Sequence, residues 1–337
     1  MNFQSSLVGI DLGTANTIIV DSARVWLREP SIVAIDQRSA TLVALGHEAL
    51  AMHEKTPPFL HTIKPLKDGV IADYSHAEKM LSGFIQKSAI HARRVGKKTF
   101  VISIPYDTTE VEKRAVIDSA KAAGASEVFL IFEPVAAAIG VGWPVFQPKG
   151  HMLIDLGGGT TEIAVISMGQ VVCNQSLRIG GFSIDREIVG GVRRQHNLHI
   201  SDRMAERIKW QIGSANADTY SAQGTLSVVG RSLATGLPEP IQLTSREIAY
   251  YLDRILSQIE TGLLKTLELC PPELAGDIYQ EGIVLTGGGA HLHGLVERWE
   301  KRLKIPVKMA KEPLNSVQLG LNYVLNHMAE CQPLLLS

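Results

Sequence analysis

Two glycine-rich turns, each preceded by an aspartate, place the strongest constraint on how this chain folds. The first lies in residues 9–20, which read G-I-D-L-G-T-A-N-T-I-I-V, and the second in residues 153–166, which read L-I-D-L-G-G-G-T-T-E-I-A-V-I. In both, an apolar run typical of a buried strand ends at an aspartate, Asp11 or Asp155, and another apolar run follows the turn. Glycines leave backbone N–H groups unshielded around an anion, so each turn is a candidate phosphate site.

Taken alone, the second turn is equally compatible with a glycine-rich hairpin that ends in a solvated aspartate. However, the tetrapeptide I-D-L-G occurs in both turns, and a threonine follows its glycine four residues later in each. The two copies lie nearly half the chain apart, which indicates a duplicated domain rather than a short repeat. A third glycine run, Gly287 to Gly289, follows the apolar segment 282–286. Two phosphate turns with a third turn for the nucleoside predict an α/β fold of two related domains.

Composition excludes several other classes of protein. The 337 residues are enough for two domains with real cores, and the net charge of −1 gives no field that favours nucleic acid. The three cysteines, Cys173, Cys270 and Cys331, form no C-x-x-C pair and are odd in number, which suits a reducing cytosol. Residues 1–7 lack the pattern of a signal peptide, and no apolar run is long enough to span a membrane. We therefore expect a cytoplasmic protein, at most peripheral to the membrane.

We expect the chain to fold as two domains. The first comprises residues 1–150 and about 314–337, and the second comprises residues 151–313. Proline-rich and turn-rich sequence at about 33–74 predicts a small inserted subdomain in the first domain, and a second insertion is predicted at about 213–242. Helices are predicted at 184–194, 201–212 and 246–269 in the second domain.

Glu133 lies where a predicted strand, residues 128–132, passes into a helix. Pro134 follows it, and proline suits the first turn of a helix because its missing N–H has no partner there. Such junctions in α/β folds lie beside the ligand crevice. Alone, Glu133 would more often be a helix-entry charge than a base, but beside two phosphate turns we predict a catalytic group.

Two charged segments each allow two interpretations. Glu206 and Lys209 share one face of a predicted helix, where they form either a surface ion pair or a clamp on a nucleoside. The basic residues at 91–98 are either a solvated turn or a contact with lipid or nucleic acid, and the solvated turn is favoured.

These motifs, taken together and in order, resemble the actin-like ATPase superfamily and, within it, the MreB family of bacterial actins. The matching segments run from residue 9 to residue 290: G-I-D-L-G-T-A-N-T, E-P-S-I-V-A-I, K-D-G-V-I-A-D, E-P-V-A-A-A-I-G, D-L-G-G-G-T-T-E, E-R-I-K-x-x-I-G-S-A, C-P-P-E-L-A and L-T-G-G-G-A. The resemblance implies an actin-like ATPase fold of two duplicated domains, each a mixed sheet flanked by helices, with a nucleotide cleft between them.

The resemblance also implies ATP and Mg²⁺ as cofactors, with roles for named residues. Asp11 and Asp155 would hold Mg²⁺ through its water shell, as their chemistry allows. Glu133 and Thr160 would act on the attacking water. The implied nucleotide contacts are Gly13, Thr14, Ala15, Asn16, Gly157, Gly158, Gly159 and Thr160 at the phosphates, Glu206, Arg207, Ile208 and Lys209 at the ribose and adenine, and Gly287, Gly288, Gly289 and Ala290 against the nucleoside.

By resemblance, the chain is an ATP-hydrolysing filament protein that helps to determine rod shape by organising cell-wall synthesis at the inner membrane. The implied partners are further copies of itself in head-to-tail filaments, paired protofilaments, a second MreB-like protein and a membrane-embedded wall-synthesis complex, but no nucleic acid. The basic segment at 91–98 predicts weak, salt-sensitive contact with the membrane surface. Two positions depart from the family pattern: Phe132 replaces a glutamate and Phe182 replaces an aspartate.

Two alternatives share the phosphate turns. A kinase of the sugar-kinase branch would need a sugar-binding motif, and we find none beside Glu133. A chaperone ATPase would need a substrate-binding domain after the ATPase unit, whereas this sequence ends at Ser337 directly after its last predicted helix.

Overall fold

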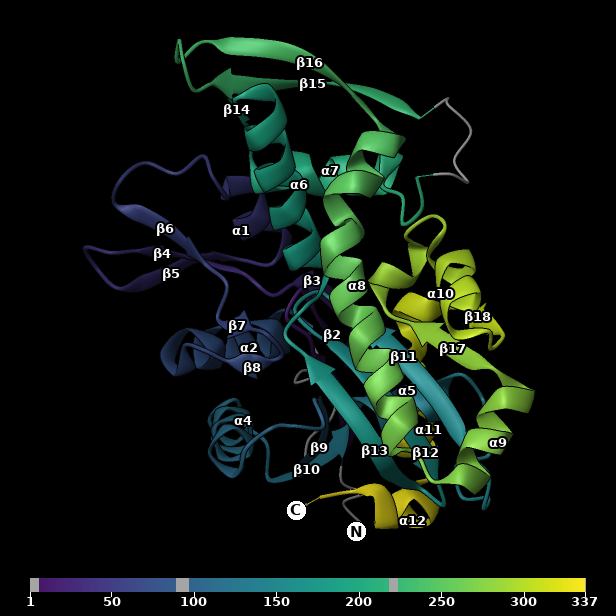
Figure 1. Cartoon of the computed structure of the whole chain (residues 1–337). Coiled ribbons are helices and arrows are strands. Elements are labelled where there is room, and N and C mark those ends of the chain that lie inside the picture. Colours follow the sequence, from purple (N-terminus) through teal and green to yellow (C-terminus); the bar gives the residue numbers. More distant parts are fainter. Residues whose placement is uncertain (1–5, 89–96, 218–223, 337) are drawn as a thin grey trace. The chain divides into compact units, whose positions relative to one another are not determined.

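The computed structural model describes residues 6–88, 97–217 and 224–336 (Figure 1). The chain divides into two compact units. The first unit contains Met1–Lys149, Ile166–Val172 and Leu314–Ser337, and the second contains Gly150–Val165 and Cys173–Pro313. Within the described ranges, no helix combines the length and apolar character needed to cross a bilayer.

The first unit is built on a mixed five-stranded sheet in the order β10-β9-β1-β2-β3. Its strands are β1 (Ser6–Leu12), β2 (Asn16–Val20), β3 (Val25–Pro30), β9 (Lys98–Ile104) and β10 (Glu127–Phe132). The first three form an antiparallel meander, and β9 and β10 are parallel to β1 because helices connect them. Among the described residues, helices of this unit outside its small subdomain include α2 (Tyr74–Lys87), α4 (Glu110–Ala122), α5 (Glu133–Gly140), α11 (Ser316–Asn326) and α12 (Met328–Cys331).

A small subdomain follows β3 in the first unit. It contains β4 (Val33–Asp36), β5 (Thr41–Leu45), α1 (His47–Met52) and β6 (Leu60–Ile63), with a three-stranded sheet in the order β5-β4-β6. The short hairpin of β7 (Leu66–Lys67) and β8 (Val70–Ile71) then leads into α2.

The second unit repeats the same sheet order as β13-β12-β11-β17-β18. Its strands are β11 (His151–Leu156), β12 (Thr161–Ser167), β13 (Gln170–Leu177), β17 (Ile283–Thr286) and β18 (Val307–Met309). Counted from the aspartate-bearing strand, β1 or β11, both sheets have two later meander strands on one side and two crossover strands on the other. The internal similarity of the sequence thus corresponds to a duplicated sheet.

Helices and a small sheet complete the second unit (Figure 1). They are α6 (Gly181–His196), α7 (Asp202–Ile212), α8 (Ser245–Leu269), α9 (Pro272–Glu281) and α10 (Leu295–Leu303), with β14 (Leu198–His199), β15 (Thr225–Ser232) and β16 (Pro238–Thr244). Helix α8 packs on the sheet so closely that a Cβ on Gly262 would lie 2.9 Å from Leu177 and 3.2 Å from Ile163. The hydrophobic core of this unit includes Trp299 on α10, which is fully buried.

Helices α5 and α11 of the first unit touch through two glycines. A Cβ built on Gly140 would overlap the carbonyl oxygen of Ser316, and one built on Gly320 would overlap that of Ala136. The two backbones therefore approach one another as only glycine allows. Because α5 begins at Glu133, this contact sets the direction of the helix that carries it.

We expect Gly320→Ala to lower the free energy of unfolding by about 1–3 kcal/mol, the usual cost of overpacking a closed core. Urea unfolding of the purified variant measures the loss. Gly276→Ala is the matched control, because a Cβ at this position in α9 would meet no atom within 4 Å. That control should be neutral or slightly stabilising, since alanine favours helix. Equal stability of the two variants would contradict the close contact of α5 and α11.

Candidate functional site

Asp11 is the penultimate residue of β1, at the edge where the neighbouring parallel strand β9 also ends. The Ser103 hydroxyl at the end of β9 donates a hydrogen bond to Asp11 Oδ1 at 3.1 Å. The register pairs the two residues directly. Asp11 is therefore held at the carboxyl edge of its sheet, where α/β folds bind ligands.

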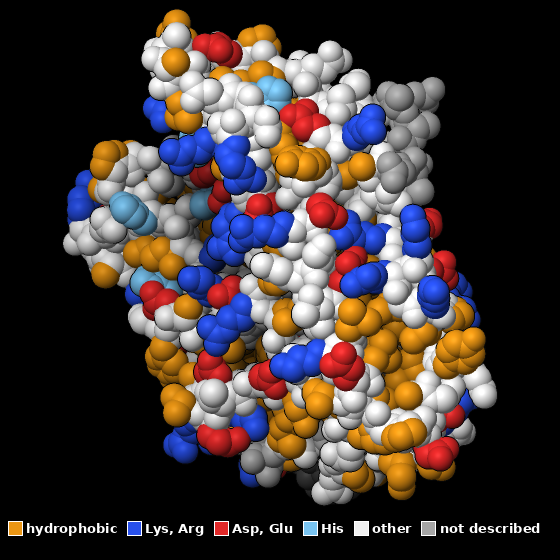
Figure 2. All heavy atoms as spheres, viewed as in Figure 1, with side chains coloured by type: hydrophobic (Ala, Val, Ile, Leu, Met, Phe, Trp, Pro, Cys, Tyr) orange, Lys and Arg blue, Asp and Glu red, His pale blue; other side chains and the backbone are white. Residues whose placement is uncertain are grey.

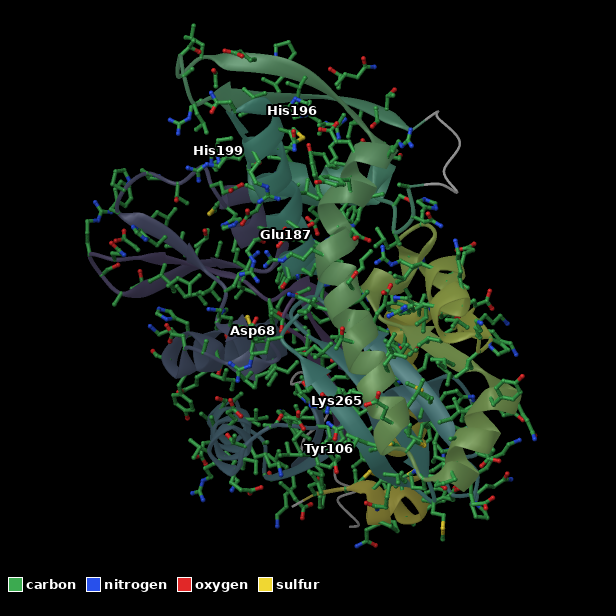
Figure 3. The ribbon with its side chains drawn as sticks, in the orientation of Figure 1. Asp68, Tyr106, Glu187, His196, His199 and Lys265 are labelled. Atoms are coloured by element: carbon green, nitrogen blue, oxygen red, sulfur yellow. The ribbon has the colours of Figure 1, made fainter. Side chains whose placement is uncertain are left out.

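The turn that follows Asp11 is held in place by residues distant in sequence. Ser31 donates through its hydroxyl to Gly13 O at 2.6 Å and through its N–H to Ala15 O at 2.9 Å. Because a trans peptide points its N–H opposite its C=O, the N–H of Thr14 points away from Ser31. The N–H of Gly69 in turn donates to the buried Thr14 hydroxyl at 2.9 Å, from the β7–β8 turn that also carries Asp68 (Figure 3).

The second turn is closed by a hydrogen bond from Gly157 N–H to Thr160 O at 2.9 Å. Its carbonyls are held by the first turn of α6: Gly181 N–H donates to Gly157 O and Phe182 N–H to Gly158 O, both at 2.9 Å. The N–H groups of Gly158 and Gly159 therefore point away from α6, as an anion site requires.

The prediction that this helix starts at residue 184 was wrong by three residues, because α6 begins at Gly181. Glycine and phenylalanine give no local signal for a helix start, and the amides there are satisfied by the distant glycine turn. A Cβ on Gly180 would lie 2.7 Å from backbone atoms of Gly158 and Gly159, so the approach needs glycine. Phe182 meets the turn through its backbone, so its departure from the family pattern leaves this contact intact.

Asp155 ends β11 in a nearly closed environment, with 9% of its surface exposed. Burial raises the pKa of this carboxyl to about 6, although the Thr286 hydroxyl donates to Oδ1 at 3.1 Å and opposes the shift. The third glycine turn begins beside it, because a Cβ on Gly287 would lie 2.5 Å from Asp155 Oδ1. Gly287 also has a φ of 78°, which favours glycine. The structure thus brings Asp155 and the turn of Gly287, Gly288, Gly289 and Ala290 together.

The four residues at 206–209 face different directions from α7. Ile208 is fully buried in the core of the second unit, whereas Arg207 is exposed and its Nε donates to Gln211 Oε1 at 3.3 Å. Glu206 and Lys209 are both partly buried. Lys209 makes an ion pair with Asp185 on α6, with Nζ 2.8 Å from Oδ1.

Glu133 is the first residue of α5 and is partly buried, and Pro134 occupies the first turn as the sequence predicts. The preceding Phe132 packs against Tyr106, with ring centroids 4.6 Å apart (Tyr106 is labelled in Figure 3). Lys113 Nζ lies 5.7 Å from the same ring. Phe132, which lies beside Glu133, thus has a packing partner in Tyr106.

Both units fit a magnesium nucleotide by their own chemistry. Each has one carboxylate near a strand end and, directly after it, a tight turn: a Cβ on Gly13 would lie 2.8 Å from Asn16 O, and one on Gly157 would lie 3.3 Å from Thr160 O. Across the described ranges, no group of three or more His, Cys, Asp or Glu could enclose a metal ion. Such residues suit Mg²⁺, because this cation keeps most of its water ligands and binds few carboxylates directly.

The supporting residues Ser31, Ser103 and Thr286 were not predicted as part of this site. Ser31 lies within the E-P-S motif, which is the one sequence signal that could have indicated it. The contacts of Ser103 and Thr286 follow only from the pairing of β9 with β1 and of β17 with β11.

A family model described as MreB/Mbl protein matches residues 5–333 of the chain. The chain belongs to the MreB/Mbl family. It is 45% identical over 321 residues to "Cell shape-determining protein MreB" of Escherichia coli (strain K12), covering 94% of this chain and 92% of that protein. It is 40% identical over 322 residues to "Cell shape-determining protein Mbl" of Bacillus subtilis (strain 168), covering 95% and 96%.

A solved member of the MreB/Mbl family has the same fold. The crystal structure of MreB5 of Spiroplasma citri bound to ADP superposes with a TM-score of 0.92 at 33% identity, covering 98% of this chain and 99% of that one. The same protein has been solved bound to AMPPNP, with a TM-score of 0.91. The predicted actin-like α/β fold is therefore confirmed, and MreB/Mbl membership displaces the sugar-kinase and chaperone alternatives.

Proposed function

We propose that this MreB/Mbl-family chain is an ATP-binding and ATP-hydrolysing bacterial actin that polymerises and helps to determine rod cell shape by organising wall synthesis. The observation that carries the proposal is geometric. In each unit a strand-end aspartate precedes a tight turn whose carbonyls are held by hydrogen bonds from elsewhere in the same unit. Relatives whose names describe cell-shape determination, and a relative bound to ADP and to AMPPNP, support it.

The proposed roles follow the chemistry of each group. The turns at 13–16 and 157–160 bind phosphates through backbone N–H groups, and the turn at 287–290 packs against the nucleoside. Asp11 and Asp155 bind the waters of Mg²⁺. When bound, Mg²⁺ neutralises charge that develops on the phosphates. The proposed domains are residues 1–150 with about 314–337, and residues 151–313.

In hydrolysis, a water oxygen attacks the terminal phosphorus while the bond to the bridging oxygen breaks. Glu133 accepts the proton from this water, and Thr160 orients it. The amide N–H groups of Gly158 and Gly159 are aligned in advance by α6, so they need no reorganisation to stabilise the transferring phosphoryl group. Turnover is proposed to be slow and to control the lifetime of filaments.

Self-association is proposed as a head-to-tail contact, which generates an open filament when the rotation does not close. Exposed apolar side chains on the second unit support such contacts: Figure 2 shows them gathered over one face, and Tyr279 on α9 is 67% exposed and Leu269 57%. Pairing of protofilaments, a second MreB-like partner and a membrane wall-synthesis complex are proposed alongside. Attachment to the membrane from the cytoplasm is assigned to the basic segment at 91–98, of which residues 91–96 lie outside the described residues.

Sedimentation with electron microscopy of the purified protein tests this function, with ATP, with ADP and without nucleotide. We expect ATP to shift most of the protein into the pellet as filaments, and ADP to do so less. A protein that binds no nucleotide and stays monomeric in every condition would overturn the proposal. A parallel screen with small hydroxylated compounds should leave ATP consumption unchanged, because a kinase alone would respond to them.

A further inference from the structure

Lys209 on α7 and Asp185 on α6 form an ion pair inside the second unit. Lys209 Nζ lies 2.8 Å from Asp185 Oδ1 and 3.0 Å from Oδ2, and it also donates to Gly181 O at 3.2 Å. The two side chains are only 15% and 6% exposed. The ammonium therefore already has acceptors within the protein, from the first turn of α6.

The ammonium of Lys209 does not itself stabilise α6. A cation beside a helix N-terminus opposes the helix dipole, and α6 begins at Gly181. Buried ion pairs in general contribute little net stability, because the desolvation of both charges offsets their attraction; their best-attested use is to specify how two elements fit together. Burial raises the pKa of Asp185 to about 6 despite Lys209, with Glu206 and Asp202 on α7 adding to the rise, which shows that desolvation is substantial here.

The contacts of Gly181 connect the pair to the phosphate turn. Its carbonyl accepts from Lys209, while its N–H donates to Gly157 O; the N–H of Phe182 beside it donates to Gly158 O. A continuous set of polar contacts thus runs from Asp185 through Lys209 and Gly181 to Gly157. If the ammonium moved, the first turn of α6 would lose its hydrogen bond to α7, and Gly181, whose N–H bonds the glycine turn, would be held in place by one contact fewer.

We propose that Asp185 and Lys209 are positioning residues, which fix the first turn of α6 against the Gly157 and Gly158 carbonyls and so preset the amides that bind the phosphates of a nucleotide. The inference rests on the proposed nucleotide site. It assigns Lys209 an indirect action on the phosphates, in place of a direct contact with the ribose or adenine.

Isothermal titration of ADP and of adenosine separates the two roles, because only ADP carries phosphates. Asp185→Asn leaves Lys209 in place, so a direct contact with the nucleoside would survive this change. We expect Asp185→Asn and Lys209→Met each to weaken ADP binding about tenfold, with adenosine affinity within twofold of wild type. The double variant should lose no more ADP affinity than either single one, because both act through the same contact.

Two further variants serve as controls for folding. Glu247→Gln removes the carboxylate from a hydrogen-bonded contact at the other end of α6, where His196 Nε2 lies 2.6 Å from Glu247 Oε1 (His196 is labelled in Figure 3). ADP affinity should stay at the wild-type level. Lys209→Arg keeps a cation and should retain most ADP affinity, which keeps the test decisive if the methionine variant does not fold.

Wild-type ADP affinity in Asp185→Asn would overturn the inference. An equal loss of ADP and adenosine affinity in Lys209→Met would also overturn it, because that result indicates a direct contact with the nucleoside. Failure of the wild-type protein to bind either compound would instead refute the proposed function itself, so the two failures are distinguishable.

Discussion

Asp155→Asn should make the ligand-free protein more stable at neutral pH while weakening its binding of Mg²⁺-ATP. The carboxylate of Asp155 is 9% exposed and has one hydroxyl donor, Thr286, on Oδ1. An ionised group in such a place costs desolvation energy that an amide does not. Its pKa of about 6 against an ordinary 3.8 corresponds to about 3 kcal/mol at pH 7. Proteins keep such costs where function needs the charge.

The sign of the pH dependence follows from the raised pKa. Between about pH 4 and pH 6 the folded protein holds a proton on Asp155 that the unfolded chain has released. Stability in the ligand-free protein should therefore fall as pH rises through this window and level off above it. Asp185, whose pKa is raised to about 6 as well, contributes a slope of the same sign. Asp155→Asn should remove the part of the pH dependence that comes from Asp155 and leave the part that comes from Asp185.

Urea unfolding from pH 4 to pH 8 measures this slope. Titration with Mg²⁺-ATP measures the affinity, which we expect to fall about 10–100-fold because the charge that holds the metal's waters is lost. Asp277→Asn is the control, since this partly exposed carboxylate accepts from Gly150 N–H and lies outside the proposed site. It should change neither quantity in this way. A destabilised Asp155→Asn protein at pH 7 would contradict this prediction, because it would show that the ionised carboxylate is favourably solvated in the folded protein.

The glycine turns could be predicted from the sequence because glycine itself carries the signal. At Gly13 and Gly287 a side chain would collide with backbone or carboxylate oxygens, and at Gly157 it would lie 3.3 Å from Thr160 O, so the glycines themselves indicate the geometry of the turns. The duplicated sheet could be predicted for a similar reason, since the same strand-and-turn pattern occurs twice.

The contacts around the turns could not be predicted, because they depend on tertiary structure. Ser31 and Asp185 are ordinary polar residues in local terms, and each bonds a partner on another segment; Lys209 was predicted as a nucleotide contact, but its ion pair with Asp185 was not. The start of α6 was mispredicted for the same reason: the acceptors for its first amides lie on a turn more than twenty residues earlier. Tertiary structure also distinguishes two neighbours in the E-R-I-K motif. Ile208 is buried in the hydrophobic core, whereas Lys209 pairs with Asp185.

The largest effect on activity is expected from Glu133→Ala, which should lower the rate of ATP hydrolysis by about 10²–10⁴, the range typical of a positioned general base. Binding of ATP and assembly should persist, because the proposed phosphate contacts are backbone amides of other segments. Helix α5 should keep its place, because contacts other than those of the carboxylate hold it. Pro134 and the residues after it are buried, and Gly140 packs closely against α11.

Phosphate release and sedimentation of the same samples test this expectation together. Glu127→Ala is a matched control, because this glutamate begins the strand β10 whose end leads to Glu133, and its side chain accepts from the Thr99 hydroxyl at the opposite end. The control should hydrolyse ATP at the wild-type rate, whereas filaments of Glu133→Ala should form in ATP and outlast those of the wild type. A Glu133→Ala rate within tenfold of wild type would exclude Glu133 as the base, and loss of assembly with intact ATP binding would show that the carboxylate acts in polymerisation instead. Filaments that persist without turnover would establish that ATP binding drives assembly and that the carboxylate at the start of α5 limits filament lifetime.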